Sequence, residues 1–198
     1  MFSHFRKQII LLVVLLTAQY IIQAQGPVAI GQKAPGFSID LLYEKKLLNL
    51  DSISKNKIVV IEFWATWCVP CIKAFPHLNE LQKKFKTENV IFLSVTYESN
   101  KNKIDSFLKK HLLTTTIGLD MDLKMFKDYA AWAIPQTIII DKQRNVVVSI
   151  HPEQLNENII KDVLDGKPLN IPNYGKQTYF DPKGAEEYFR KLEKEGKN

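Results

Sequence analysis

The sequence predicts an α/β domain with a mixed central β-sheet and helices on both of its faces. Segments rich in β-branched residues alternate with segments whose apolar residues recur every three or four positions, which favours parallel strands joined by helices. The last two predicted strands follow one another through a short turn, which adds antiparallel pairing. The composition is typical of a soluble globular domain, because 45% of the 198 residues are hydrophobic and 24% are charged.

The clearest strand signal is KIVVIEFWA at residues 57–65, a nearly continuous apolar run typical of a buried central strand. The other predicted strands are 89–97, 115–120, 134–141 and 146–150, with an N-terminal hairpin of 37–42 and 45–50.

A helix is predicted directly after the 57–65 strand, since apolar residues recur at helical spacing from Ile72 to Phe85. Pro70 suits its first turn, whereas Pro76 inside the repeat predicts a kink. Further helices are predicted at 102–112, 122–130 and 152–166, the last ended by Gly166.

Both ends of the chain extend beyond the predicted domain, which covers 25–166. Residues 1–24 have the form of a signal peptide, with Arg6 and Lys7 ahead of an apolar stretch, and they predict export. An uncleaved anchor formed by residues 9–22 is the alternative, although that stretch is shorter than a membrane span of about 20 residues. Residues 167–198 are expected to form a polar, partly helical C-terminal extension. The sequence leaves open whether this extension docks on the domain or makes no contact with it.

The net charge of +6 does not indicate nucleic-acid binding. Two of the positive charges belong to the segment 1–24, and the remainder comes from scattered lysines. No arginine cluster is present, nor a stretch that interleaves aromatic with basic residues.

The only two cysteines, Cys68 and Cys71, stand in the stretch WATWCVPC. As a structural disulfide the pair would close a very small loop and remove little unfolded-state entropy. Cys68 falls where a buried strand is expected to end and a helix to begin. Unpaired N–H groups at a helix start stabilise a thiolate, so we expect the pKa of Cys68 below the roughly 8.5 of a free thiol.

The two thiols are expected to take different roles. Cys68 is assigned as the exposed nucleophile, and Cys71, three residues further on, as the buried thiol that resolves the mixed disulfide. Val69 and Pro70 lie between them and are expected to tune the reduction potential, because Pro70 offers no N–H to the Cys68 thiolate.

Together these features resemble the thioredoxin superfamily, and more narrowly the extracytoplasmic thiol–disulfide oxidoreductases of the TlpA/ResA type. The resemblance covers roughly residues 31–166 and rests on IEFWATWCVPC, the helix containing Pro76, and AIPQTIIID. It implies a thioredoxin fold in which Pro135 takes the cis form and faces the dithiol. Ile134 would then offer its backbone to a client peptide. The alternative for Pro135 is an ordinary proline at the start of a strand.

Glu62 stands where thioredoxin has its buried acidic residue, so the resemblance implies that it takes the proton of Cys71 during resolution. The alternative is a partly solvated residue at the edge of the sheet. Trp67, directly before Cys68, is expected to form an apolar lip for client docking, whereas Trp64 is expected in the core.

The same residues allow other functions. A structural zinc site would use both cysteines with His77, His111 or His151, but these histidines form no second spaced pair. Copper delivery is a further alternative, although copper carriers of this fold space their cysteines by three residues and use a distal histidine. A peroxidase would need a different setting around a single cysteine. A redox-inactive binding module is the remaining alternative.

The resemblance implies an enzyme that reduces disulfides of periplasmic client proteins through Cys68 and Cys71. A membrane-embedded thiol electron donor would reduce it again. Neither a metal nor an organic cofactor is expected, because the electrons reside in the redox-active disulfide.

Overall fold

The computed structural model describes residues 28–131, 133–169 and 171. Seven strands form one sheet in the order β2-β1-β5-β4-β3-β6-β7. Their bounds are β1 Ser38–Leu41, β2 Leu47–Asn49, β3 Ile58–Phe63, β4 Val90–Thr96, β5 Thr116–Leu119, β6 Gln136–Ile140 and β7 Val146–Ile150. All the predicted strands are therefore present.

The sheet is mixed, as the sequence predicts. The strands β3, β4 and β5 run parallel, and β6 and β7 add antiparallel pairs beside β3. The hairpin β1–β2 joins the other side through an antiparallel pair of β1 with β5. All six residues of β3 are buried, which explains the continuous apolar run in the sequence.

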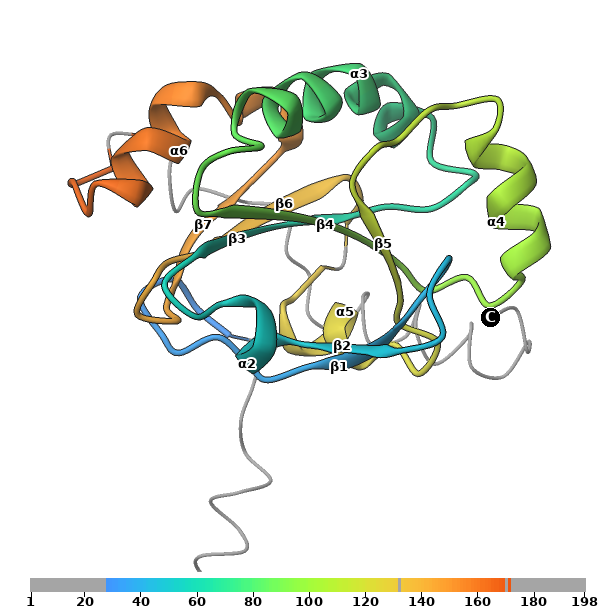
Figure 1. Ribbon diagram of the computed structural model, residues 1–198, viewed down its shortest axis with the longest axis horizontal. Helices are drawn as coiled ribbons and strands as arrows, with labels where there is room; N and C mark the ends of the chain where they lie inside the picture. The colour runs from blue at the N-terminus through green and yellow to red at the C-terminus, as the bar shows by residue number, and fades with distance from the viewer. Residues whose placement is uncertain (1–27, 132, 170, 172–198) are drawn as a thin grey trace, which may run out of the picture.

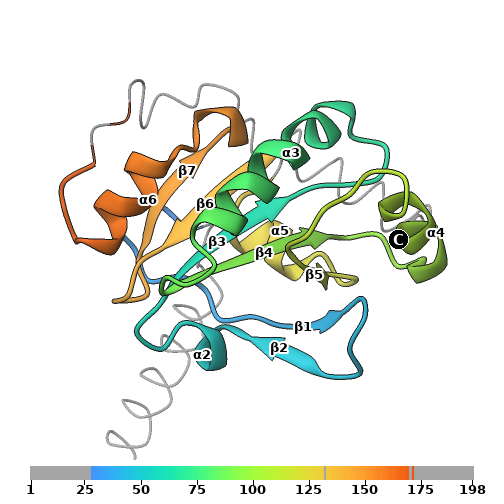
Figure 2. The same cartoon turned by 45° about the horizontal axis from the view of Figure 1, so that its top comes forward.

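Helices cover both faces of the sheet (Figures 1 and 2). Helices α3 and α6 lie on one face, and α5 lies on the other. Their bounds are α2 Leu50–Ile53, α3 Val69–Lys84, α4 Lys101–Leu108, α5 Lys124–Asp128 and α6 Glu157–Leu164. The short helix α2 was not predicted. Within the described residues, no helix has the length and apolar character needed to span a bilayer.

Two predicted helices are wrong in extent. The helix predicted at 102–112 corresponds to α4, which ends at Leu108. The segment 152–166 is divided into a 3₁₀ turn, η1 Pro152–Gln154, and α6. Asn156 separates the two, because its side chain accepts hydrogen bonds from the N–H groups of Asn158 and Ile159 and so starts a new helix. The segment 1–24 and the extension from residue 172 onward lie outside the described residues.

Candidate redox site

The dithiol lies at the junction of β3 and α3, where the sequence predicts it. β3 ends at Phe63, and Cys68 is the N-cap of α3. The Cys68 sulfur accepts a hydrogen bond from the backbone N–H of Cys71 at 3.3 Å. The two residues form a disulfide bond, so the structure shows the oxidised state. Pro70 occupies the first turn, and the helix continues through Pro76.

The expectation of an exposed Cys68 is wrong for this state. Cys68 is 2% exposed and Cys71 is fully buried. The physical reason is the bond itself, which ties the Cys68 sulfur to a sulfur in the core. The neighbours form the surface instead, since Trp67 is 55% and Val69 is 58% exposed.

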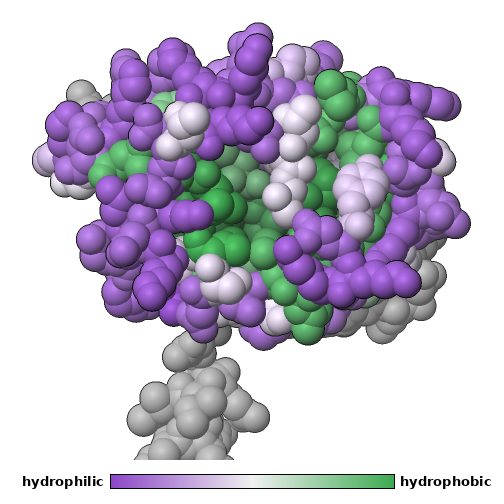
Figure 3. Space-filling model, in the orientation of Figure 1, coloured by the Kyte–Doolittle hydropathy of each residue, from purple (hydrophilic) through white to green (hydrophobic). Residues whose placement is uncertain are grey.

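Trp67 is held by a hydrogen bond rather than by packing alone. Its indole N–H donates to the hydroxyl of Tyr97 at 3.1 Å, and Tyr97 meets the ring of Phe126 edge-on. Trp64, by contrast, is buried and lies edge-on against Phe75, as expected for a core residue. On the face seen in Figure 3, apolar residues gather toward the middle and hydrophilic residues form most of the rim.

Glu62 is buried within β3 and is only 2% exposed. Its strand lies between β4 and β6, so a position at the sheet edge is excluded. One carboxyl oxygen accepts a hydrogen bond from the Thr137 hydroxyl, and the other has no partner among the described residues. Burial raises the pKa of Glu62 to about 8, and the bond from Thr137 offsets part of that rise. A group that titrates near neutrality is suited to proton transfer.

The bond between Ile134 and Pro135 is cis, as the resemblance implies. Gln136, the next residue, pairs with Phe63 in the antiparallel register of β6 and β3. The cis-proline therefore lies at the end of the sheet from which the chain continues to Cys68. Pro135 is buried and Ile134 is half-buried.

Sequence reasoning missed Glu98, which follows β4. It is 7% exposed, and its two carboxylate oxygens accept hydrogen bonds from the backbone N–H and the hydroxyl of Thr66 at 2.6 and 2.7 Å. Lys103 forms an ion pair with it at 2.8 Å. The signal was present, because functional groups gather beyond the carboxyl ends of parallel strands and YES follows directly on such a strand.

The histidines considered as metal ligands do not meet. His77 bonds the carbonyl of Leu155 at 2.7 Å, His111 lies against Phe107, and His151 caps η1. Within the described ranges, no group of three or more His, Cys, Asp or Glu residues could hold a metal ion.

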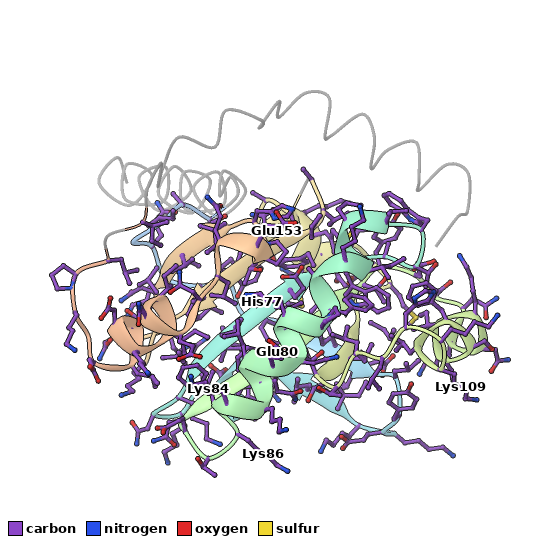
Figure 4. The ribbon with its side chains drawn as sticks, turned by 90° about the horizontal axis from the view of Figure 1, so that it is seen from above. His77, Glu80, Lys84, Lys86, Lys109 and Glu153 are labelled. Carbon is purple, nitrogen blue, oxygen red and sulfur yellow. A yellow bond between two sulfur atoms is a disulfide. The ribbon has the colours of Figure 1, made fainter. Side chains whose placement is uncertain are left out.

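A hollow of about 390 Å³ lies between α3 and the start of α6. His77, Glu80 and Lys84 line it along α3 (Figure 4), together with Asn156 and Glu157. His77, Glu80 and Lys84 belong to the second half of α3, whereas the dithiol lies at the start of that helix. The hollow is therefore separate from the redox site.

The structure combines a thioredoxin-type sheet with a Cys-x-x-Cys pair at a helix start and a cis-proline at the same end of the sheet. This combination defines a thiol–disulfide oxidoreductase. Comparisons with known proteins agree. A protein named thiol-disulfide oxidoreductase ResA from Bacillus cereus is 33% identical over 130 residues, which cover 66% of this chain and 74% of the relative. Another of that name from Geobacillus kaustophilus is 31% identical and covers 80% of this chain and 93% of its own.

Solved structures give the same result. A crystal structure described as a thiol-disulfide oxidoreductase from Bacteroides vulgatus matches with a TM-score of 0.60 and 30% identity, over 69% of this chain and 97% of that chain. The model of the AhpC/TSA family matches residues 30–149. The chain belongs to this family, and its activity is that of a thiol–disulfide oxidoreductase.

Proposed function

We propose that the protein reduces disulfide bonds of client proteins outside the cytoplasm, with Cys68 as the attacking thiol and Cys71 as the resolving thiol. The observation that supports this most directly is the position of Cys68 as the N-cap of α3, with its sulfur bonded to the N–H of Cys71. A thiolate at Cys68 would keep that hydrogen bond and gain from the helix dipole.

The reduction proceeds in two exchange steps. The Cys68 thiolate attacks one sulfur of the client disulfide, and the other client sulfur leaves as a thiolate and takes up a proton. Cys71 then gives its proton to the Glu62 carboxylate and attacks the Cys68 sulfur, which releases the second client thiolate. That thiolate takes up a proton from solvent, and Glu62 returns the proton of Cys71 to solvent. The client gains two electrons and two protons, and the enzyme is left with the Cys68–Cys71 disulfide.

Client binding is proposed to use the surface around the dithiol. The exposed ring of Trp67 supplies an apolar lip, and the backbone of Ile134 pairs with an extended client segment. Val69 and Pro70 set the reduction potential between the two sulfurs. A membrane-embedded thiol donor then returns two electrons, so that the dithiol carries them without a metal or an organic cofactor.

We also propose that the protein is located outside the cytoplasm. Residues 1–24 would export a single domain of residues 25–166, and the stretch 9–22 would act as an anchor if it stays uncleaved. Residues 167–198 would then be an extension of this domain in the periplasm. No function is proposed for that extension.

The test is to trap the client. Cys71→Ser, expressed as the full chain in its native compartment, should accumulate mixed disulfides through Cys68, because the resolving thiol is missing. Non-reducing gels followed by mass spectrometry identify the attached proteins. The matched control, Cys68→Ser, keeps only the buried Cys71 and should form far fewer adducts. Equal adducts in both proteins would contradict the assignment of Cys68.

The direction of electron flow is measured separately. Equilibration of the purified protein with glutathione gives its reduction potential. A value near the roughly −270 mV of thioredoxin supports a reductase, whereas a value near the roughly −120 mV of DsbA supports an oxidase.

A further inference from the structure

Glu98 is a buried carboxylate that the exchange steps do not use. Both of its oxygens accept hydrogen bonds from Thr66, one from the backbone N–H and one from the hydroxyl. Charge-assisted hydrogen bonds of this kind are stronger than bonds between neutral groups. Lys103, on α4, balances the negative charge from the solvent side, where its own side chain is mostly exposed.

Thr66 lies in the turn that delivers the chain to Cys68. The N–H of Cys68 donates to the carbonyl of Ala65 at 3.1 Å, so residues 65–68 form a closed four-residue turn. Thr66 and Trp67 are its two central residues. Such a turn does not use the N–H of its second residue, and Glu98 accepts this N–H.

Both central residues of the turn are attached to the end of β4. Glu98 holds Thr66, and the neighbouring Tyr97 accepts the indole N–H of Trp67. Because β4 is the middle strand of the sheet, the turn is fixed to the rigid centre of the molecule as well as to α3. The position of the Cys68 sulfur over the first turn of α3 therefore depends on contacts from another strand.

We propose that Glu98 is a positioning residue of the redox site, which holds the turn 65–68 so that the Cys68 sulfur stays over the first N–H groups of α3. The inference rests on the proposed role of Cys68 as the attacking thiol. Without the two bonds to Thr66 the turn can shift, and a shifted sulfur gains less from the N–H of Cys71 and from the helix dipole. The thiolate is then less favoured, and attack at neutral pH slows.

The experiment measures the acidity of Cys68 in the reduced full-length chain. Iodoacetamide alkylation is followed from pH 4 to 10, and peptide mapping assigns the modified cysteine. Thr66→Val removes the hydroxyl and keeps the backbone N–H and the ion pair with Lys103. Glu98→Gln keeps the side-chain volume and removes the charge. In both variants we expect alkylation of Cys68 at pH 6 to be about three- to tenfold slower, since a smaller fraction is thiolate.

Two controls separate positioning from general stability. Thr66→Ser restores the hydroxyl and should react within about twofold of the wild type. Lys103→Met removes the ion pair but neither bond to Thr66, and it should do the same. Melting temperatures of all variants are recorded alongside.

Each outcome of the alkylation experiment either supports or overturns the role of Glu98. Wild-type alkylation profiles in folded Thr66→Val and Glu98→Gln would overturn the proposal, even if their melting temperatures fall, because Glu98 would then serve stability alone. If Glu98→Gln fails to fold, Thr66→Val decides by itself. A wild-type Cys68 no more acidic than a free thiol would instead contradict the proposed function, before any variant is compared.

Discussion

At the scale of the residue, the burial of Glu62 has a consequence for pH. Its pKa is raised to about 8 because its charged form loses solvation in the core. The ordinary pKa of this carboxyl group is 4.5. Between pH 4.5 and about pH 8, Glu62 is therefore deprotonated in the unfolded chain but stays protonated in the folded chain. The folded state then binds more protons, so the contribution of Glu62 to the free energy of unfolding falls as pH rises through this window and stays constant above it.

Glu62→Gln should remove this dependence. Relative to the variant, the wild type is expected to lose on the order of a few kcal/mol of unfolding free energy between pH 5 and pH 8, as each unit of pKa shift is worth about 1.4 kcal/mol. Denaturant unfolding at several pH values measures it. Parallel pH profiles for the two proteins would show that Glu62 does not carry a raised pKa.

The same variant tests the proton-acceptor role of Glu62. Release of the mixed disulfide should slow by about tenfold or more, because a positioned base typically contributes at least about a hundredfold and water replaces part of it. The first attack by Cys68 should keep its rate. Stopped-flow measurement of both steps with a model disulfide separates them, and equal release rates would refute the role.

The dithiol could be placed from the sequence because its signal is local, whereas Glu62, Ile134 and Pro135 were singled out through the resemblance. The spacing of Cys68 and Cys71 and the apolar run before them place a dithiol at a helix start without any tertiary information. For Glu98 the sequence showed only its place directly after a parallel strand and not its partner, since Thr66 lies 32 positions away in the chain. The burial of Cys68 in the disulfide-bonded state was also not predicted from the order of residues.

At the scale of the element, Gly118 fixes how closely the hairpin approaches the sheet. A Cβ at this position would lie 2.4 Å from the Cδ1 of Ile39. Leu41 of β1 pairs with Gly118 of β5, so the clash falls where the hairpin joins the parallel strands.

Gly118→Ala is therefore expected to lower the free energy of unfolding by about 1–3 kcal/mol, as overpacked cores do. Ile39→Val removes the obstructing methyl group and should lower it by about 0.5–1.5 kcal/mol by itself. Chemical denaturation of the single and double variants forms a cycle in which the double variant loses less than the sum. Strict additivity would mean that Ile39 is not what the new methyl group meets.

The division of the segment 152–166 shows the limit of helical periodicity. Leu155, Ile159, Ile160 and Val163 are all buried, so the predicted apolar face is real. A continuous helix would leave Asn156 inside it, but the side chain of Asn156 bonds backbone N–H groups two and three residues ahead. Capping by such a residue competes with helix continuation, and apolar spacing does not report it.

At the scale of the whole molecule, the sheet order predicts where the fold opens first. The strands β3 and β4 have neighbours on both sides, whereas β2 is a three-residue edge strand whose Leu47 is 62% exposed. Amide hydrogen exchange followed by mass spectrometry should be at least about a hundredfold slower in β3 and β4 than in β2. Similar rates in β2 and β3 would mean that the sheet opens as one unit.

The sequence by itself determined the fold class, the strands that form the sheet, and the dithiol at the start of a helix, because periodicity, β-branched runs and Cys-x-x-Cys spacing act over short distances. Tertiary structure decided which strands lie side by side, and with them the isolation of Glu62 from solvent and the attachment of Thr66 to Glu98. Those features join residues far apart in the chain, and their energies arise only when folding removes water between them.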